Sequence, residues 1–254
     1  MSVTIKSARE IELMREAGKI LCKTHEELSK ALKPGMTTWD IDHLGEEIIR
    51  SYGCQPSFLN YNGYPASICV SVNDEVVHGI PSKKRILMEG DIVSLDAGVI
   101  YKGYHSDAAR TYGIGEITPF AGQLIEVTRQ CFFEGIKFAK SGNHLNDISA
   151  AIQIHAEKFG FGVVRDLVGH GIGTHLHEEP EVPNFAQKRR GIKLKPGMTL
   201  AIEPMINGGT PEVVWLDDDW TVVTEDGSLS AHYENTVLIT EGEPEILSLV
   251  SFDR

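Results

Sequence analysis

The sequence contains no long hydrophobic run. No stretch approaches the roughly 18 apolar residues that a transmembrane helix requires, and the opening residues MSVTIKSARE lack the apolar core of a signal peptide. Cysteine is also scarce, with 4 residues in 254 and no CxxC spacing. These absences argue against membrane insertion, secretion and a disulfide framework, so we expect a cytoplasmic protein with reduced thiols.

The sequence also lacks a basic surplus. It has 24 Lys and Arg residues against 36 Asp and Glu residues, which gives a net charge of −12. Nucleic-acid binding depends on clustered positive charge that displaces counterions, so we expect no specific nucleic-acid partner. The one basic cluster, Lys188–Arg190 with Lys193 and Lys195, is expected to be a solvated loop. The remaining composition, with 41% hydrophobic residues, is ordinary for a globular protein with a sizeable core.

A β-hairpin is predicted over residues 91–111. Its two strands, Asp91–Ile100 and Gly103–Thr111, are rich in Val, Ile, Ala and Thr, and a turn is expected at Tyr101-Lys102. With that two-residue loop, Asp96 pairs directly with Asp107. Like charges placed opposite each other repel, so two facing carboxylates in an apolar hairpin need a cation or a shared proton. The hairpin therefore predicts a metal site.

Helices are predicted on both sides of this hairpin, because cap residues precede segments with helical spacing of apolar residues. A shorter strand is expected near Ser67–Val72, and the motif VVHGIP follows at Val76–Pro81. The first helix follows the Ser7 capping box and ends at Lys33-Pro34-Gly35, and the second runs from about Thr38 to a stop at Gly53. The third begins at Thr118-Pro119 and ends near Lys140–Gly142, and the fourth extends from about Leu145 to Phe159.

The two halves of the chain resemble each other. A shift of 107 positions carries Asp96 onto Glu203, and a shift of 127 carries Asp107 onto Glu234. The segment Val77–Ile80 likewise has a partner in Gly169–Ile172. We therefore predict an α/β protein of one domain, residues 1–254, in which a helix–helix–hairpin unit is duplicated at about residues 7–115 and 116–240. A pseudo-twofold axis would bring the acidic residues of the two halves together.

The predicted junction has the chemistry of a metal centre. A lone acidic residue is usually solvated at the surface, but the hairpin and the duplication argue against that for the whole set. Oxygen ligands with one imidazole suit divalent Mn, Fe, Co or Zn, and four carboxylates are enough for two ions that share them. The predicted ligands are Asp96, Asp107, His170, Glu203 and Glu234.

Several other polar residues stay ambiguous from their spacing alone. His78 lies beside a turn and fits either a buried loop histidine or a site residue. His175 and His177 lie on the same side of an extended segment, and the sequence does not choose between them. Glu178 and Glu179 lie outside the repeat and are interpreted as loop acids.

The motifs VVHGIP, SLDAG, HSDAAR, LVGHGIG, HEEP, IEPM and WTVVTEDGSLSAHYENT together resemble type I methionine aminopeptidases of the bacterial kind, within the M24 metallopeptidases. The resemblance covers nearly the whole chain and implies the pita-bread α/β fold. It also implies hydrolytic removal of the N-terminal methionine from nascent chains whose second residue is small. Two divalent metal ions per chain, transient ribosome association without a docking extension, and a monomeric state are the accompanying expectations.

The resemblance also implies roles for individual residues. The five predicted ligands match the family's dinuclear set, with Asp107 and Glu234 as bridging carboxylates and Glu203 as the acid that relays protons. His78 matches the residue near the scissile amide, and His177 rather than His175 matches the one that stabilises the tetrahedral intermediate. The remaining matches are the methionine pocket, Tyr61, Tyr64, Cys69, Leu176 and Trp220 with Phe58 at its rim, and a structural monovalent cation site at Asn73 and Ser230.

Four positions depart from the commonest pattern of that family. Leu176 stands where an aromatic residue is frequent and Phe58 where Cys is frequent, while His232 and Asn235 replace a common Gln and His. None of the four is a predicted metal ligand, so they bear on the tightness of the pocket rather than on activity.

Two rival functions share the predicted fold. Prolidases and aminopeptidases of the Xaa-Pro type have the same five ligands but usually carry a further N-terminal domain. Non-catalytic pita-bread modules lack the complete ligand set, which this chain keeps. Hydrolysis of Met-Ala peptides against Xaa-Pro peptides would discriminate between the enzymes.

Overall fold

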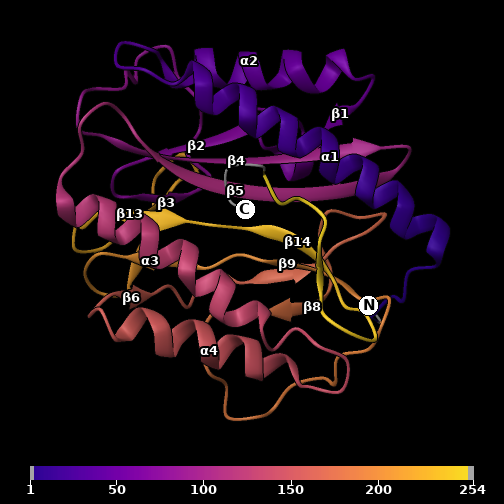
Figure 1. Cartoon of the computed structure of the whole chain (residues 1–254). Coiled ribbons are helices and arrows are strands. Elements are labelled where there is room, and N and C mark those ends of the chain that lie inside the picture. The colour runs from indigo at the N-terminus through magenta and orange to yellow at the C-terminus, as the bar shows by residue number, and fades with distance from the viewer. Residues whose placement is uncertain (1–2, 251–254) are drawn as a thin grey trace.

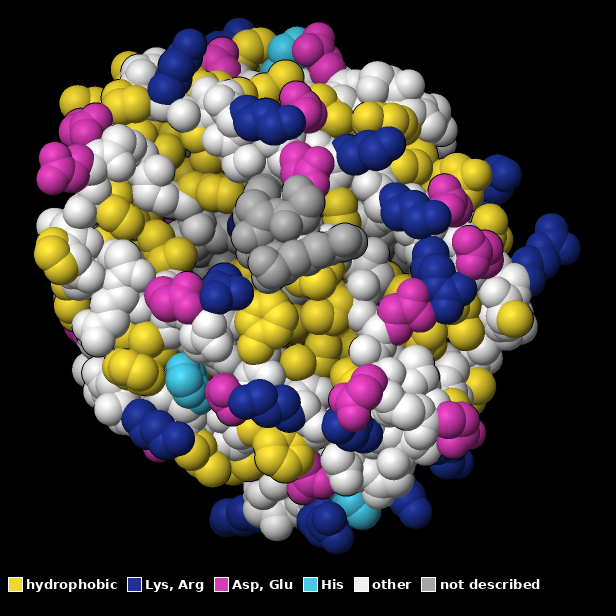
Figure 2. Space-filling model, viewed as in Figure 1, with side chains coloured by type: hydrophobic (Ala, Val, Ile, Leu, Met, Phe, Trp, Pro, Cys, Tyr) yellow, Lys and Arg dark blue, Asp and Glu magenta, His cyan; other side chains and the backbone are white. Residues whose placement is uncertain are grey.

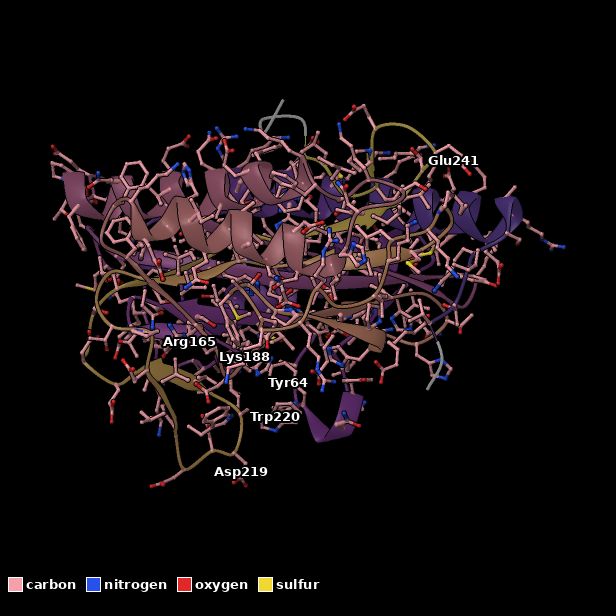
Figure 3. The ribbon with its side chains drawn as sticks, turned by 90° about the horizontal axis from the view of Figure 1, so that it is seen from below. Tyr64, Arg165, Lys188, Asp219, Trp220 and Glu241 are labelled. Carbon is pink, nitrogen blue, oxygen red and sulfur yellow. The ribbon has the colours of Figure 1, made fainter. Side chains whose placement is uncertain are left out.

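The computed structural model describes residues 3–250, and Figure 1 shows its mixed α/β architecture. Helices α1 (Ala8–Ala31) and α2 (Thr38–Ser51) lie together over one group of strands, and α3 (Pro119–Ile136) and α4 (Leu145–Glu157) lie over another. Figure 3 shows the helices on one side of the sheets. None of the helices in residues 3–250 is long and apolar enough to cross a membrane.

Local capping explains where the helices begin. The Ser7 side chain accepts from the backbone N–H of Glu10 while the Glu10 carboxylate accepts from the backbone N–H of Ser7, which satisfies two donors at the start of α1. Thr37 and Asp40 form the same arrangement at α2. Helix α3 ends earlier than predicted, at Ile136 instead of near residue 140, because residues 137–140 form tighter turns such as Phe138 N–H to Gly135 O at 2.9 Å.

The first half is built on one four-stranded antiparallel sheet. Strand β4 pairs with β2 on one side and with β5 on the other, and the short β1 also pairs with β4. Helix α1 packs on β4 and β5, and α2 packs on β2. The bounds are Gln55–Pro56 for β1, Ile68–Val72 for β2, Ile92–Tyr101 for β4 and Tyr104–Gly113 for β5.

The β4–β5 hairpin has a different register from the predicted one. Tyr101 pairs with Tyr104, so the turn residues are Lys102 and Gly103, with φ of 48° and 84°. A two-residue turn of this kind requires positive φ at both positions, and Gly at the second position provides it at low cost. Asp107 therefore lies opposite Gly98, and the predicted direct pairing of Asp96 with Asp107 was wrong by two positions. A shift of two keeps both acids on the same face of the sheet.

The second half supplies every strand of the remaining sheets except β3, which comes from the first half. One has the strand order β15-β14-β9-β7-β8, a second β13-β10-β6 and a third β11-β12-β3. The bounds are Glu75–Val77 for β3, Gly162–Val163 for β6, Gly169–Gly171 for β7, Glu178–Val182 for β8, Thr199–Ile202 for β9, Met205–Asn207 for β10, Val213–Trp215 for β11, Val222–Thr224 for β12, Ser230–His232 for β13, Asn235–Leu238 for β14 and Glu245–Ile246 for β15.

Strands β9–β10 and β13–β14 share one continuous antiparallel register. Ile202 pairs with Asn235, Met205 pairs with His232, and between these pairs the Tyr233 N–H donates to Pro204 O at 3.1 Å. Continuing the register by one position from Ile202 and Asn235 places Glu203 opposite Glu234. The direct pairing of acids that was predicted for the first hairpin is therefore the arrangement found in the second half.

Side-chain hydrogen bonds join the two halves along β5. The Thr236 hydroxyl oxygen accepts from the backbone N–H of Asp107 at 2.8 Å, and the Thr111 hydroxyl oxygen accepts from the backbone N–H of His232 at 2.8 Å. The backbone N–H of Glu234 donates to Ala109 O at 2.9 Å. These contacts fix the acidic residues of one half against those of the other.

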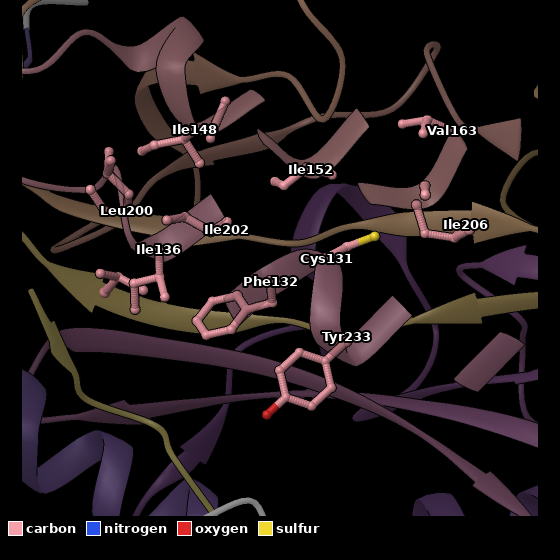
Figure 4. Close-up of a cluster of buried hydrophobic side chains, with 14 of the residues drawn as sticks. Cys131, Phe132, Ile136, Ile148, Ile152, Val163, Leu200, Ile202, Ile206 and Tyr233 are labelled. Carbon is pink, nitrogen blue, oxygen red and sulfur yellow. The ribbon is translucent and has the colours of Figure 1, made fainter. Parts of the chain in front are cut away.

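Each half has a large hydrophobic cluster, and two smaller clusters combine residues of both halves. Figure 4 shows the core of the second half, where Phe132 of α3 and Tyr233 lie ring against ring with centroids 5.4 Å apart. The helix surfaces facing solvent carry mixed charges, among them the i, i+3 pairs Lys19–Glu16 and Lys137–Glu134. Figure 2 shows both signs of charge distributed over this face. The basic residues Lys188–Arg190 are exposed, as expected for a loop.

Candidate metal centre and active site

One cavity of about 130 Å³ lies at the junction of the two halves. Asp96 on β4 and Asp107 on β5 enter it from the first half, and His170 on β7 enters it from the second. Glu203 follows β9 and Glu234 precedes β14, so their facing register carries both into the same cavity. The structure thus brings together all five predicted ligands, and donor atoms of Asp107, His170 and Glu234 lie within 4.8 Å of one another.

Asp107 and Glu234 are buried and Asp96 and Glu203 are largely buried, without positive partners sufficient for their charge. Burial raises the pKa of Asp96 to about 7 and that of Glu203 to about 8. Burial and then the neighbouring acids raise the pKa values of Asp107 and Glu234 well above the ordinary range. In addition, Asp96 Oδ1 and Glu234 Oε1 have no hydrogen-bond partner among residues 3–250. Buried acceptors without donors need a cation or a proton, and four carboxylates with one imidazole are a ligand set that fits a divalent metal centre.

The hydrogen bonding of His170 leaves the lone pair of its Nε2 directed towards the carboxylates of the cavity. Its Nδ1 lies 2.9 Å from Gly171 O, and donation to this carbonyl places the proton on Nδ1. Its Nε2 lies 3.6 Å from Glu203 Oε1, and burial lowers the pKa of the ring to about 3, so it stays neutral. A Cβ atom at Gly169 would lie 2.4 Å from Ala201 O and one at Gly171 would lie 2.2 Å from Glu179 O, so only glycine allows β7 between its neighbours.

His78 lies in the same cavity, directly after β3. Its φ is 60°, an unfavourable value for a residue with a side chain, and strained backbone of this kind costs of order 1–3 kcal/mol. Its ring packs edge-on against Trp220 with centroids 6.2 Å apart. Burial lowers the pKa of His78 to about 4. The structure therefore favours a site histidine over a loop histidine.

The structure separates His177 from His175. His177 lines the cavity, its ring stands edge-on to His170 at 4.2 Å, and its Nδ1 lies 2.8 Å from the Tyr61 hydroxyl. If the Tyr61 O–H donates to Nδ1, the Nε2 of His177 carries the proton and can donate to a substrate oxygen. His175 is exposed, as is the outer part of His177, but only His177 lines the cavity. Of the two histidines, the geometry selects His177.

An aromatic slot forms the outer part of the cavity. Tyr64 and Trp220 stand edge to face with ring centroids 5.1 Å apart, and the Tyr64 hydroxyl donates to Gly79 O at 2.9 Å. Figure 3 shows both rings on the side of the sheets that faces away from the helices. The predicted pocket residues all line this cavity, namely Phe58, Tyr61, Tyr64, Cys69, Leu176 and Trp220.

Two residues of the site were missed from the sequence. Asn62 lines the cavity from the short helix η1 (Tyr61–Gly63), where its φ is 49°. The Asn-Gly pair at Asn62-Gly63 was a usable signal for such a left-handed turn. His232 is the second, because its Nε2 lies 3.6 Å from Glu203 Oε2. The sequence showed it only as a departure from a family pattern.

The two residues of the predicted monovalent cation site, Asn73 and Ser230, are neighbours, and their side chains form hydrogen bonds with other protein groups. The backbone N–H of Ser230 donates to Asn73 O at 2.8 Å. The Asn73 amide donates to Asp91 Oδ1 and its oxygen accepts from the backbone N–H of Ile92, while the Ser230 hydroxyl donates to Asn207 Oδ1. Asn73 and Ser230 are thus side by side, and a cation there stays a prediction.

Glu178 differs from its predicted role as a loop acid. It begins strand β8, and its carboxylate forms an ion pair with Lys6 at 2.6 Å in which both side chains are buried. Because Glu178 directly follows His177, this pair ties the N-terminal segment to the wall of the cavity. Glu179 is exposed.

Comparisons with known proteins agree with this geometry. Residues 12–241 match the profile of Metallopeptidase family M24. A methionine aminopeptidase of Clostridium acetobutylicum is 58% identical over 247 residues, which span 97% of this chain and 99% of the relative. The crystal structure of a methionine aminopeptidase from Thermotoga maritima matches with a TM-score of 0.95 at 47% identity, over 97% of this chain and 99% of that one. An Xaa-Pro dipeptidase from Bacillus anthracis matches with a TM-score of 0.79 at 25% identity, over 96% of this chain but 61% of the dipeptidase.

Proposed function

The chain belongs to metallopeptidase family M24, and from this premise we propose that it is a methionine aminopeptidase with the pita-bread fold. Its reaction is the hydrolytic removal of an N-terminal methionine when the second residue is small. The observation that carries this function is a cavity in which an aromatic slot opens onto five clustered donors. The Xaa-Pro alternative is not favoured, because relatives that are 40–58% identical over the full chain are methionine aminopeptidases.

The slot suits the methionine side chain. That side chain is unbranched and apolar, so a narrow wall of Tyr64, Trp220 and Leu176 selects it mainly by shape. A hydrophobic pocket gains about 1–3 kcal/mol per methylene group, which is enough for useful selectivity. The carboxylates at the inner end favour a free α-amine, so internal peptide bonds are poor substrates. A bulky second residue would crowd the acidic cluster.

The five clustered donors are proposed to hold two divalent ions, with Asp107 and Glu234 shared between them. Bound divalent ions acidify a water molecule and polarise a carbonyl group. Mn, Fe, Co and Zn all suit this ligand set, and availability often decides among them. A structural monovalent cation at Asn73 and Ser230 is a separate proposal.

The protein groups then move protons and stabilise charge. Glu203 takes a proton from the attacking water and returns it to the leaving amine, which is general acid–base catalysis by one carboxylate. His177 donates from Nε2 to the developing oxyanion, a contribution often worth several kcal/mol. His78, whose ring packs against Trp220, steadies the nitrogen side of the scissile amide.

Several properties of the whole molecule complete the proposal. Residues 1–254 form a single catalytic domain that arose by internal duplication, with repeats at about residues 7–115 and 116–240. The protein acts in the cytoplasm as a monomer on N-terminal peptides of nascent chains. Its association with ribosomes is transient, and it binds no nucleic acid specifically.

Peptide hydrolysis by the metal-loaded protein tests the function. Protein freed of metal with a chelator and reloaded with one ion at a time should hydrolyse Met-Ala-Ser and leave Xaa-Pro peptides intact. Asp107→Asn, which keeps the shape and removes the shared charge, should abolish turnover and weaken metal binding measured by calorimetry. Faster hydrolysis of Xaa-Pro peptides would reject the proposal, and full activity of Asp107→Asn would reject the two-metal centre.

A further inference from the structure

His232 lies against the proposed catalytic carboxylate but has no role in the mechanism above. Its ring is 1% exposed, and neither ring nitrogen has a hydrogen-bond partner among residues 3–250. A buried polar atom left without a partner costs about 1–3 kcal/mol. A ring with two such atoms next to Glu203 indicates a contact that the working site uses.

The position of the ring follows from strand pairing. His232 pairs with Met205 in the register that β10 and β13 share, and Met205 is two residues beyond Glu203. Its backbone N–H donates to the Thr111 hydroxyl oxygen at 2.8 Å, and its carbonyl accepts from the same hydroxyl at 3.0 Å. The backbone of His232 is therefore fixed from both neighbouring strands, β10 and β5.

Two imidazole rings flank the carboxylate of Glu203. His170 Nε2 lies 3.6 Å from Oε1, and His232 Nε2 lies 3.6 Å from Oε2. The rings differ at their other nitrogen, because His170 Nδ1 donates to Gly171 O whereas His232 Nδ1 faces no acceptor within residues 3–250. The proton of His170 is thus held away from Glu203, while the carboxylate favours a proton on Nε2 of His232. Equal distances therefore correspond to opposite roles, a lone pair in His170 and a donor in His232.

We propose that His232 is a positioning residue, which donates from Nε2 to Oε2 of Glu203 and holds this carboxylate in its working orientation. The inference rests on the proposed function for the role of Glu203, but the contact itself does not. The contact with Glu203 requires a hydrogen-bond donor at the position of Nε2 and no polar group at the position of Nδ1. Glutamine can place its amide N–H near the former position, asparagine places it near the latter, and leucine fills the space without a donor.

The test compares His232→Gln, His232→Asn and His232→Leu with wild-type protein. His155→Gln is the matched control, because His155 on α4 also has a buried Nε2 without a partner among the described residues, but its ring packs against Phe159 and not against Glu203. The readouts are kcat and KM for Met-Ala-Ser, and the binding stoichiometry, affinity and visible absorption spectrum of Co²⁺. Far-UV circular dichroism checks that each variant folds.

We expect a KM-against-kcat split. His232→Leu and His232→Asn should lower kcat about 10- to 100-fold with little change in KM, which is the usual cost of removing a partner of a metal ligand. His232→Gln keeps a donor and should stay within about threefold of wild type. The Co²⁺ spectrum should change in His232→Leu and His232→Asn and be largely restored in His232→Gln. His155→Gln should match wild type in every readout.

Other results would overturn the proposal. If His232→Gln is as impaired as His232→Leu, a donor at Nε2 is not what the site needs. If the number of bound Co²⁺ ions falls in His232→Gln, the ring is a ligand and not a positioning residue. If wild-type protein does not cleave Met-Ala-Ser, the proposed function fails, and the Co²⁺ spectra of the His232 variants still decide the contact with Glu203. The Gln and Asn variants keep the test valid if His232→Leu does not fold.

Discussion

The hydroxyl of Tyr61 lies 2.8 Å from Nδ1 of His177. The two residues are 116 positions apart in sequence. Their contact joins the short helix η1 to the segment between β7 and β8. The two rings also meet edge to face with centroids 5.2 Å apart. One hydrogen bond thus sets both the direction of the His177 ring and the nitrogen that faces the cavity.

Tyr61→Phe should lower kcat for Met-Ala-Ser about 2- to 10-fold, because a typical hydrogen bond contributes about 0.5–1.5 kcal/mol. The aromatic wall is kept, so KM should change less than kcat. Tyr104→Phe is the control, since that hydroxyl donates to Glu10 and lies outside the cavity. Equal kcat values for Tyr61→Phe and wild type would show that His177 is oriented without this bond.

The two neighbouring histidines should behave very differently. His177→Ala removes the donor at the cavity and should lower kcat about 100- to 1,000-fold, the usual effect of deleting one donor to an oxyanion. His175→Ala should leave kcat near the wild-type value, because its ring does not line the cavity. Steady-state hydrolysis of Met-Ala-Ser measures both. Similar, mild effects would mean that neither ring reaches the substrate.

The metal-free protein should lose stability as pH rises. The folded-state pKa values of Asp96 and Glu203, about 7 and about 8, lie above the value of about 4 for unfolded carboxyl groups. Between about pH 4 and 8 the folded state binds more protons than the unfolded state, so these two groups lower the free energy of unfolding as pH rises through that window. Urea unfolding at several pH values, with chelator present, measures the slope.

Asp96→Asn isolates this effect. The variant removes one buried acid and the repulsion it exerts, so its stability should fall less steeply with pH than that of the wild-type protein. Bound divalent metal should also flatten the wild-type curve, because it stabilises the ionised carboxylates. A slope that is identical in wild type and Asp96→Asn would contradict the assignment of the pH dependence to this cluster.

The buried pair Lys6–Glu178 should matter for stability. Lys6→Met leaves the Glu178 charge buried without its partner, which typically costs about 3–5 kcal/mol. The double variant Lys6→Met with Glu178→Gln should lose less than the two single variants together, because the charge is then gone. Urea unfolding of the metal-loaded protein measures all three. Lys137→Met at the exposed pair with Glu134 is the control and should change little.

Local chemistry allowed much of the fold to be predicted. The starts of α1, α2 and α3 follow from Ser7, Thr37 and Thr118, whose side chains accept hydrogen bonds from the first turn. The hairpin register was harder, since Tyr101-Lys102 and Lys102-Gly103 are both possible two-residue turns. Only the requirement for positive φ at the second turn residue selects Gly103. The acidic face survived this error because the two registers differ by an even number of residues.

The remaining parts of the site depend on contacts between distant segments. His232 reaches Glu203 only because β13 pairs with β10, and no local pattern announces that pairing. The choice of His177 over His175 likewise depends on Tyr61 and His170, which come from other elements. Apart from the family resemblance, the long-range information in the sequence came from the duplication, which placed Glu203 and Glu234 in the same cavity as Asp96 and Asp107.

The continuous register of β9–β10 with β13–β14 holds Glu203 and Glu234 in the middle of the ladder, whereas the aromatic wall at Trp220 lies beyond its end. The last pair of this ladder, Asn207 with Ser230, closes it before the chain departs into the segment that carries Trp220. Changes in the turn between β11 and β12, residues 216–220, lie beyond this closing pair and should leave the pairing of Glu203 with Glu234 unchanged. Because this turn carries Trp220, substitutions in it should change the preference of the enzyme for the substrate side chain while the acidic cluster stays in place.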